Sequence, residues 1–151
     1  MASIKFETGL KLYDIEDEKG NIRGQISFNP TDVNLSIRAQ KVGEIIDECF
    51  AEVSELGEDA GEDVYKEKIV EYDDKIKDAI NMLFDDENAS NVIFGSQNCL
   101  NTLNGVTLVE RFLTAMMPVI QKEIASEQKQ SQKRIAKYTN NVTQKTKAGK
   151  K

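Results

Sequence analysis

Acidic side chains are the most abundant groups in this sequence that could do chemistry. The chain has 26 Asp and Glu residues, no His and two Cys. Without His, a Ser–His or Cys–His catalytic pair is excluded, and the commonest protein ligand of transition metals is missing. A carboxylate pair for glycoside hydrolysis stays open, but among 26 acidic residues some pair always lies close together, so their number indicates no site.

The acidic clusters do not match a calcium-binding loop, which needs Gly at its sixth position and Glu at its twelfth. A loop that begins at Asp85 has Ser90 and Ser96 there, and one that begins at Asp14 has Lys19 at the sixth position. The nine glycines do not have the spacing of a phosphate-binding loop. We therefore predict a protein that is not an enzyme and that binds no metal ion and no cofactor.

Charge is distributed unevenly along the chain. Residues 121–151 contain nine Lys and Arg and two Glu, whereas residues 1–120 contain 11 basic and 24 acidic side chains. An acidic body repels nucleic acid, and the basic end has few aromatic side chains for base stacking, so we predict no specific nucleic-acid binding. The basic end could attract nucleic acid non-specifically, bind an acidic partner or another copy of the chain, or keep the protein soluble.

The cysteines and the N-terminus bear on where the protein works. Cys49 and Cys99 lie among apolar residues, which favours buried free thiols over a disulfide. The first six residues are too polar for a secretion signal, and no apolar run approaches the ~20 residues that cross a membrane. We expect a cytoplasmic protein that is not secreted and has no membrane contact.

Alternating apolar and polar residues predict a β-hairpin within residues 4–28. Its strands are 9–15 and 22–28, and the charged stretch between them ends in Gly20-Asn21, which favours a turn. Ile4 and Phe6 could add a short third strand. Because a lone hairpin is only marginally stable, it should pack on the protein's own helices or pair with another chain at its edge.

Two long amphipathic helices should follow. Asn29 is the expected N-cap of the first, with Pro30 in the first helical position and Asp32 near the positive end of the helix dipole. Apolar residues then recur at steps of three and four to Leu56. After a break at 57–61, a second helix over 62–84 should pack antiparallel to the first.

The rest of the chain is less regular. A short helix is expected over 96–103, and Thr107 and Glu110 then form a capping box at the start of another helix. Pro118 should kink or end that helix. Residues 126–151 form a polar basic tail, which we expect to be partly helical and then disordered from about Thr139.

These patterns predict a helix-dominated α+β fold. One globular domain spans residues 1–125, with an N-terminal β-hairpin (4–28) packed on a three- to four-helix bundle (30–125), and the basic tail (126–151) follows. The apolar stripes of the helices could form a groove for a helical partner, and the methionines could adapt its shape, although core packing explains them equally. The candidate protein-binding residues are Val42, Ile46, Phe50, Val53, Tyr65, Ile69, Tyr72, Phe112, Met116 and Met117.

The order of these features resembles that of a known protein family. A short hairpin, the helix start Phe28-Asn29-Pro30-Thr31-Asp32-Val33, an acidic helical body and a basic end are similar to the small tail assembly chaperones of long-tailed phages and prophages of Gram-positive bacteria. The resemblance covers residues 9–125. It implies a non-enzymatic protein of the infected or lysogenic host's cytoplasm, which binds the long helical tape measure protein and helps tail tube subunits assemble around it.

The resemblance also implies partners and alternatives. Because many copies would coat one client, we expect self-association, and contact with the tail tube protein is a further expectation. A structural head–tail connector or tail component would instead form a closed ring and contain more β-structure. A small cytosolic regulator that binds a host protein is the other alternative.

Overall fold

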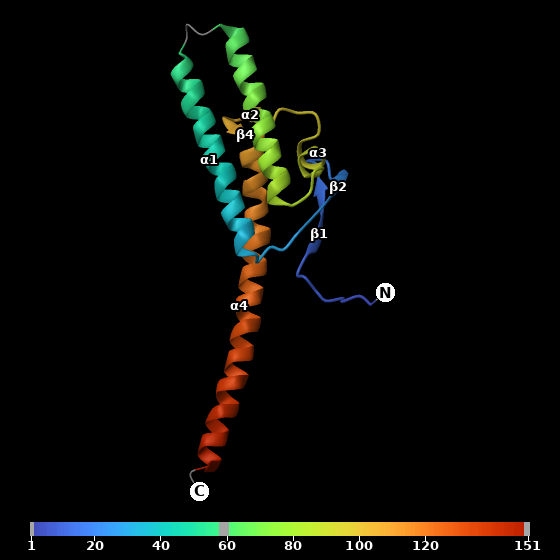
Figure 1. Ribbon diagram of the computed structural model, residues 1–151, viewed down its shortest axis with the longest axis vertical. Coiled ribbons are helices and arrows are strands. Elements are labelled where there is room, and N and C mark those ends of the chain that lie inside the picture. Colours follow the sequence, from blue (N-terminus) through green and yellow to red (C-terminus); the bar gives the residue numbers. More distant parts are fainter. Residues whose placement is uncertain (1, 58–60, 150–151) are drawn as a thin grey trace.

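The computed structural model describes residues 2–57 and 61–149, with side chains described as far as Thr139. Helices dominate, and a two-stranded antiparallel hairpin precedes them, which confirms the predicted fold class (Figure 1). The elements in chain order are β1 (Lys11–Glu16), β2 (Ile22–Phe28), α1 (Val33–Leu56), α2 (Glu62–Leu83), α3 (Ala89–Phe94), β3 (Thr102–Leu103), β4 (Val106–Thr107) and α4 (Leu108–Gly149).

The N-terminal hairpin has the predicted alternation of buried and exposed residues. Tyr13 of β1 lies opposite Ile26 of β2, and the ring of Tyr13 stacks on that of Phe28 with centroids 4.5 Å apart. These side chains face the helices, whereas Leu12 and Ile22 are exposed on the other face. The hairpin therefore packs on the protein's own core through one face.

The predicted third strand at Ile4 and Phe6 is wrong. Residues 2–10, here called the N-terminal arm, form no strand and lead away from the hairpin (Figure 1). The backbone changes direction at Gly9, just before β1 begins. The φ of Gly9 is +85°, and a Cβ there would lie 2.7 Å from the side-chain nitrogen of Asn29, so only glycine allows the chain to pass this close to Asn29.

Asp17 holds the turn between β1 and β2. Its carboxylate accepts hydrogen bonds from the main-chain N–H groups of Lys19 and Asn21, each at 2.9 Å, and from the Asn21 side chain. These bonds, chiefly the one from the Asn21 main chain, hold the pKa of Asp17 below its ordinary value. The ionised carboxylate is therefore the form that stabilises the turn.

Acid should loosen this turn. Because the pKa of Asp17 is lowered on folding, its contribution is complete above the unfolded-state value of about 3.9 and is lost as the pH falls through the lower folded-state value. Amide chemical shifts of Lys19 and Asn21, followed by NMR during an acid titration, should report this transition. Asp17→Ala should abolish it and Glu18→Ala should preserve it. A transition midpoint above the ordinary Asp value would contradict the expectation.

The first long helix begins later than predicted. Its N-cap is Asp32, whose carboxylate accepts from the N–H of Asn34 at 2.9 Å, so the N-cap prediction for Asn29 is wrong. Asn29 instead holds a turn before the helix: its side-chain oxygen accepts from the Thr31 N–H, and its carbonyl accepts from the Asp32 N–H. Pro30 occupies the second position of this turn, which suits its fixed φ.

The segment between α2 and α4 also differs from the prediction. The short helix lies at Ala89–Phe94, not at 96–103. Asn98 explains the absence of a helix there, because its side chain accepts from the Leu100 N–H at 2.9 Å and so stabilises a turn. A second small hairpin, β3–β4, then turns at Asn104 and Gly105, which both have positive φ.

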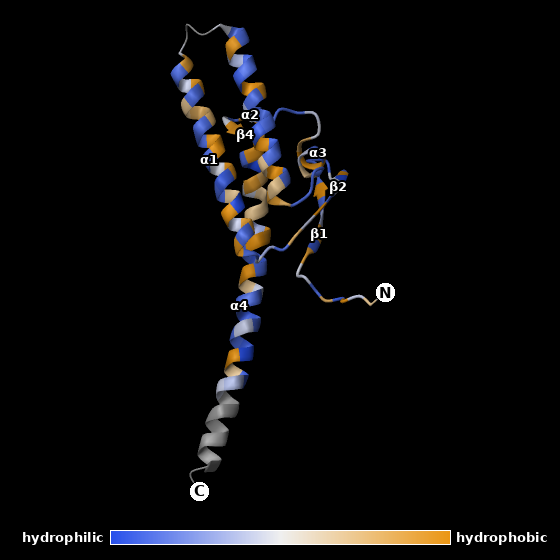
Figure 2. Cartoon of the chain, viewed as in Figure 1, coloured by the Kyte–Doolittle hydropathy of each residue, from blue (hydrophilic) through white to orange (hydrophobic). Residues whose placement is uncertain are grey.

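Five aromatic rings join the parts of the core. In sequence of contact they are Tyr13, Phe28, Phe84, Phe112 and Phe94, with successive centroids 4.5 to 6.1 Å apart. The series links β1 and β2 to the end of α2, to α4 and to α3. Around it pack the apolar sides of α1, α2 and the first part of α4 (Figure 2).

The last helix is longer than predicted. The Thr107 hydroxyl accepts from the Glu110 N–H at 3.2 Å, as expected of a helix cap. Pro118 does not end α4, because it lies on an exposed side where water can solvate the carbonyl that loses its N–H partner. The backbone is helical to Gly149. Residues 124–139 are all exposed.

Candidate protein-binding surfaces

The structure places several predicted binding residues inside the domain. Val42 and Ile46 of α1 and Tyr72 of α2 are 0%, 5% and 1% exposed, and Met116 of α4 is 8% exposed. All of them belong to one core cluster, which holds the helices and the hairpin together. The apolar stripes therefore serve the fold along this part of their length.

Toward the free end of the α1–α2 pair the same stripes become exposed. We call residues 47–56 and 62–71 the α1–α2 arm. Within it, Cys49 is still 1% exposed, Val53 and Ile69 are half-buried, and Phe50 and Tyr65 are 47% and 48% exposed. The remaining candidates lie on α4, where Phe112 is half-buried and Met117 is 54% exposed. The structure thus places four of the predicted residues on the arm.

The arm is exposed because α4 begins too far along the fold to cover it. The Cys99 N–H donates to the Asp73 carboxylate at 2.7 Å, and the Cys99 carbonyl accepts from the Val109 N–H at 2.9 Å, so α4 starts level with Asp73. From there α4 runs in the same direction as α2, because Phe112 contacts Phe84. Residues 62–72 of α2 therefore extend about 15 Å beyond the start of α4 (Figure 1).

Acidic side chains surround this exposed seam. The arm has eight Asp and Glu and two Lys residues. Lys68 forms ion pairs with Glu52 and Glu71, at 3.6 and 3.4 Å. The Tyr72 hydroxyl hydrogen-bonds to the Glu52 carboxylate, which raises the pKa of Tyr72 and lowers the pKa of Glu52. Glu52 therefore stays ionised, and the arm presents an apolar seam with an acidic rim.

A second apolar hollow, the β1–α4 cleft, lies between the hairpin and α4. Its volume is about 220 Å³, and Tyr13, Ile15, Phe112, Met116 and Val119 are among the residues that line it. The Tyr13 hydroxyl is buried and has no hydrogen-bond partner in the described part of the chain. Phe112 and Met116 are candidates predicted from the sequence, but the β1 residues are not. The predicted hairpin has a free edge, but the sequence does not show which helix lies beside that edge.

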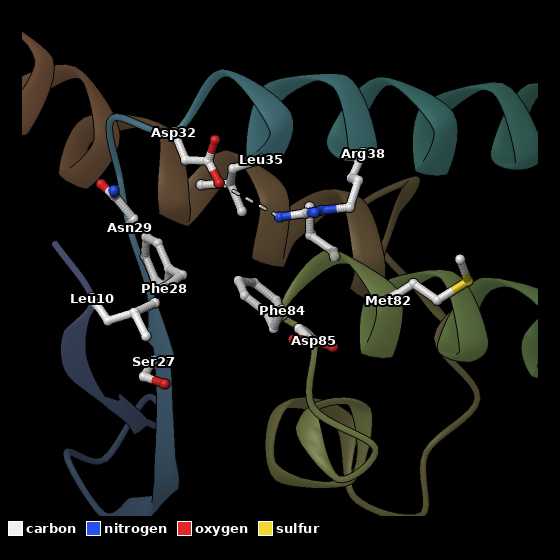
Figure 3. Close-up of a pocket in the computed structure, with 11 residues that line it drawn as sticks. Leu10, Ser27, Phe28, Asn29, Asp32, Leu35, Arg38, Met82, Phe84 and Asp85 are labelled. Carbon is white, nitrogen blue, oxygen red and sulfur yellow. Dashed lines mark ion pairs between the residues drawn. The ribbon is translucent and has the colours of Figure 1, made fainter. Parts of the chain in front are cut away.

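A more polar pocket of about 410 Å³ lies where β2, the start of α1 and the end of α2 meet (Figure 3). Arg38 extends across it toward Asp32, to which it forms a weak ion pair at 3.8 Å. Phe84 and Asp85 lie on another side of the pocket. Because the lining contains one guanidinium and two carboxylates, it does not favour an anionic ligand, and we assign no reaction to it.

The other kinds of site to consider are a metal centre, a membrane span and a reactive thiol. Among the described residues, no group of three or more His, Cys, Asp or Glu side chains is placed to hold a metal ion. No helix in residues 2–57 and 61–149 combines the length and the apolar character that a membrane span requires. Cys49 and Cys99 are free and buried, as predicted, and burial raises the pKa of both thiols. These thiols are therefore protonated and poorly nucleophilic at neutral pH.

Comparisons with family models, with curated proteins and with solved structures find no match to this chain. The two apolar surfaces, the α1–α2 arm and the β1–α4 cleft, are therefore the candidate sites for a partner.

Proposed function

We propose that this protein is a non-enzymatic tail assembly chaperone of a long-tailed phage or prophage. In this proposal it acts in the cytoplasm of the bacterial host, binds the tape measure protein and helps tail tube subunits assemble around it. The resemblance in the order of sequence features supports this choice of family, and the α1–α2 arm supports the mode of binding.

The observation that carries the proposal is the change in burial along one continuous apolar stripe. Ile46 and Tyr72 are 5% and 1% exposed where the bundle is complete, whereas Phe50 and Tyr65, farther along the same helices, are 47% and 48% exposed. No other described helix covers the arm. A helical segment of the client, laid on the arm in line with α4, would complete the packing that α4 provides below it.

The charge of the arm suits such a client. Glu48, Glu52 and Glu55 make one side of α1 acidic, without a basic residue in this part of the helix. They would attract Lys and Arg residues that flank the apolar stripe of a client helix and would discourage acidic helices. The surplus negative charge would also keep a complex of many copies on one long client soluble.

Replacing Phe50 and Tyr65 together with serine should weaken client binding at least tenfold, because buried aromatic side chains often dominate helix-in-groove interfaces. The measurement is affinity capture of the tape measure protein co-expressed with each chaperone variant. Met82→Ser is the matched control, since Met82 is 72% exposed but lies far from the arm on α2. Equal capture by both variants, with unchanged circular dichroism, would contradict binding at the arm.

The same experiment can be extended to the phage. Disruption of the gene should abolish tails and leave heads normal. Detection of the protein at a fixed copy number in purified particles would contradict the chaperone proposal and would favour a structural tail component.

A further inference from the structure

The N-terminal arm carries apolar side chains that its own chain does not cover. Ile4 and Phe6 are 92% and 72% exposed, and they alternate with the charged residues Lys5 and Glu7. This alternation is typical of a strand with one apolar face. The arm thus has the pattern of a strand but makes no strand contacts in the described chain.

The outer edge of β1 is open to such a strand. In the described residues β1 pairs with β2 alone, so the main-chain groups of its outer edge have no strand partner. Tyr13 and Ile15 of β1 form one wall of the β1–α4 cleft, and Val119 of α4, which is 36% exposed, forms part of the other. An added strand would cover these residues and would pair with the free main-chain groups of β1.

The N-terminal arm does not reach the β1 edge of its own chain. Gly9 lies close to Asn29, and the residues before Gly9 extend away from β1. The complementary edge of a second molecule is free to receive it. We propose that the N-terminal arm of one copy adds as a third strand to β1 of a second copy and covers the β1–α4 cleft there.

In one antiparallel register between the N-terminal arm and β1, the apolar side chains of the arm are buried and its Lys5 faces an acidic residue. With Phe6 opposite Tyr13 and Ile4 opposite Ile15, both apolar side chains of the arm fall on the face toward α4. The same register places Lys5 opposite Asp14, which is exposed on the other face. Opposite charges in directly facing strand positions stabilise the pair, so charge supports the same register as burial.

This strand exchange goes beyond the proposed function, because it requires no client. Purified full-length protein without client should therefore self-associate, as measured by analytical ultracentrifugation. Lys5→Glu and Asp14→Lys should each weaken association at least tenfold, and the two substitutions combined in one chain should restore it. Lys19→Glu, in the hairpin turn, makes the same charge change and should have no effect. A monomeric wild-type protein, or failure of the combined variant to recover, would overturn the proposal.

Disulfide trapping distinguishes exchange between copies from folding back within one chain. Chains with Phe6→Cys, mixed with chains with Val119→Cys, should give a cross-linked heterodimer under oxidising conditions. Ile135→Cys is the control partner, because Ile135 is 63% exposed on α4 but lies outside the cleft. If a chain with both Phe6→Cys and Val119→Cys forms only an internal disulfide at every concentration, the arm covers its own cleft and the proposal is wrong.

Discussion

Replacing Phe94 with alanine should lower the free energy of unfolding by about 3–5 kcal/mol, as for other buried Phe side chains. Phe94 is 1% exposed, and its ring meets the edge of Phe112 with centroids 6.1 Å apart. Through this contact the short helix α3 is held against α4. Since small domains are stable by only about 5–15 kcal/mol, this one change would remove a large part of the total.

Urea denaturation followed by circular dichroism would measure the effect. Ile22→Ala is the control, because Ile22 is 61% exposed on the hairpin and should change the free energy of unfolding by no more than about 0.5 kcal/mol. A loss below about 1 kcal/mol for Phe94→Ala would mean that α3 does not pack in the core as described.

Asp73→Ala should have the second-largest effect, a loss of about 2–3 kcal/mol, because it leaves a hydrogen-bond donor inside the protein without an acceptor. The Asp73 carboxylate, 13% exposed, accepts from the Cys99 N–H at 2.7 Å and pairs with Lys77 at 3.0 Å. Cys99 in turn accepts from the Val109 N–H. Loss of the carboxylate should therefore loosen the start of α4.

Two further variants sharpen this prediction. Asp73→Asn keeps an oxygen acceptor and should cost less than Asp73→Ala. Asp74→Ala removes the neighbouring carboxylate, which is exposed, and should be nearly neutral. Amide hydrogen exchange at Cys99 and Val109 should become faster in Asp73→Ala alone. Equal stability of Asp73→Ala and Asp74→Ala would contradict the described role of Asp73.

Periodicity alone was enough to predict the hairpin and the two long helices, because each has apolar residues that recur regularly on one face. The start of α1 was harder to predict. Asn29 and Asp32 are both good capping residues, and the choice between them depends on the turn that Asn29 and Thr31 form. The β3–β4 hairpin had a local signal in Asn104-Gly105, but its strands have only two residues each and show no periodicity.

The sequence was enough to predict which residues form the apolar stripe of the α1–α2 arm, but not which of them are exposed. The sequence shows that Ile46 and Phe50 belong to one apolar stripe, yet it does not show where that stripe loses its cover. That point is set by the start of α4, which depends on contacts of Cys99 with Asp73 and Val109. Such contacts join residues that are distant in the chain, and no local pattern encodes them.

The two ends of this elongated molecule carry charge of opposite sign. The α1–α2 arm has eight acidic and two basic side chains, whereas residues 124–139, at the other end, have four basic and one acidic. The protein is therefore a long electric dipole in addition to a net anion of charge −6. In dilute salt, where the screening length is about 30 Å, neighbouring molecules would orient with unlike ends together in spite of their shared net charge. At 1 M salt, where that length falls to about 3 Å, the orienting attraction would vanish.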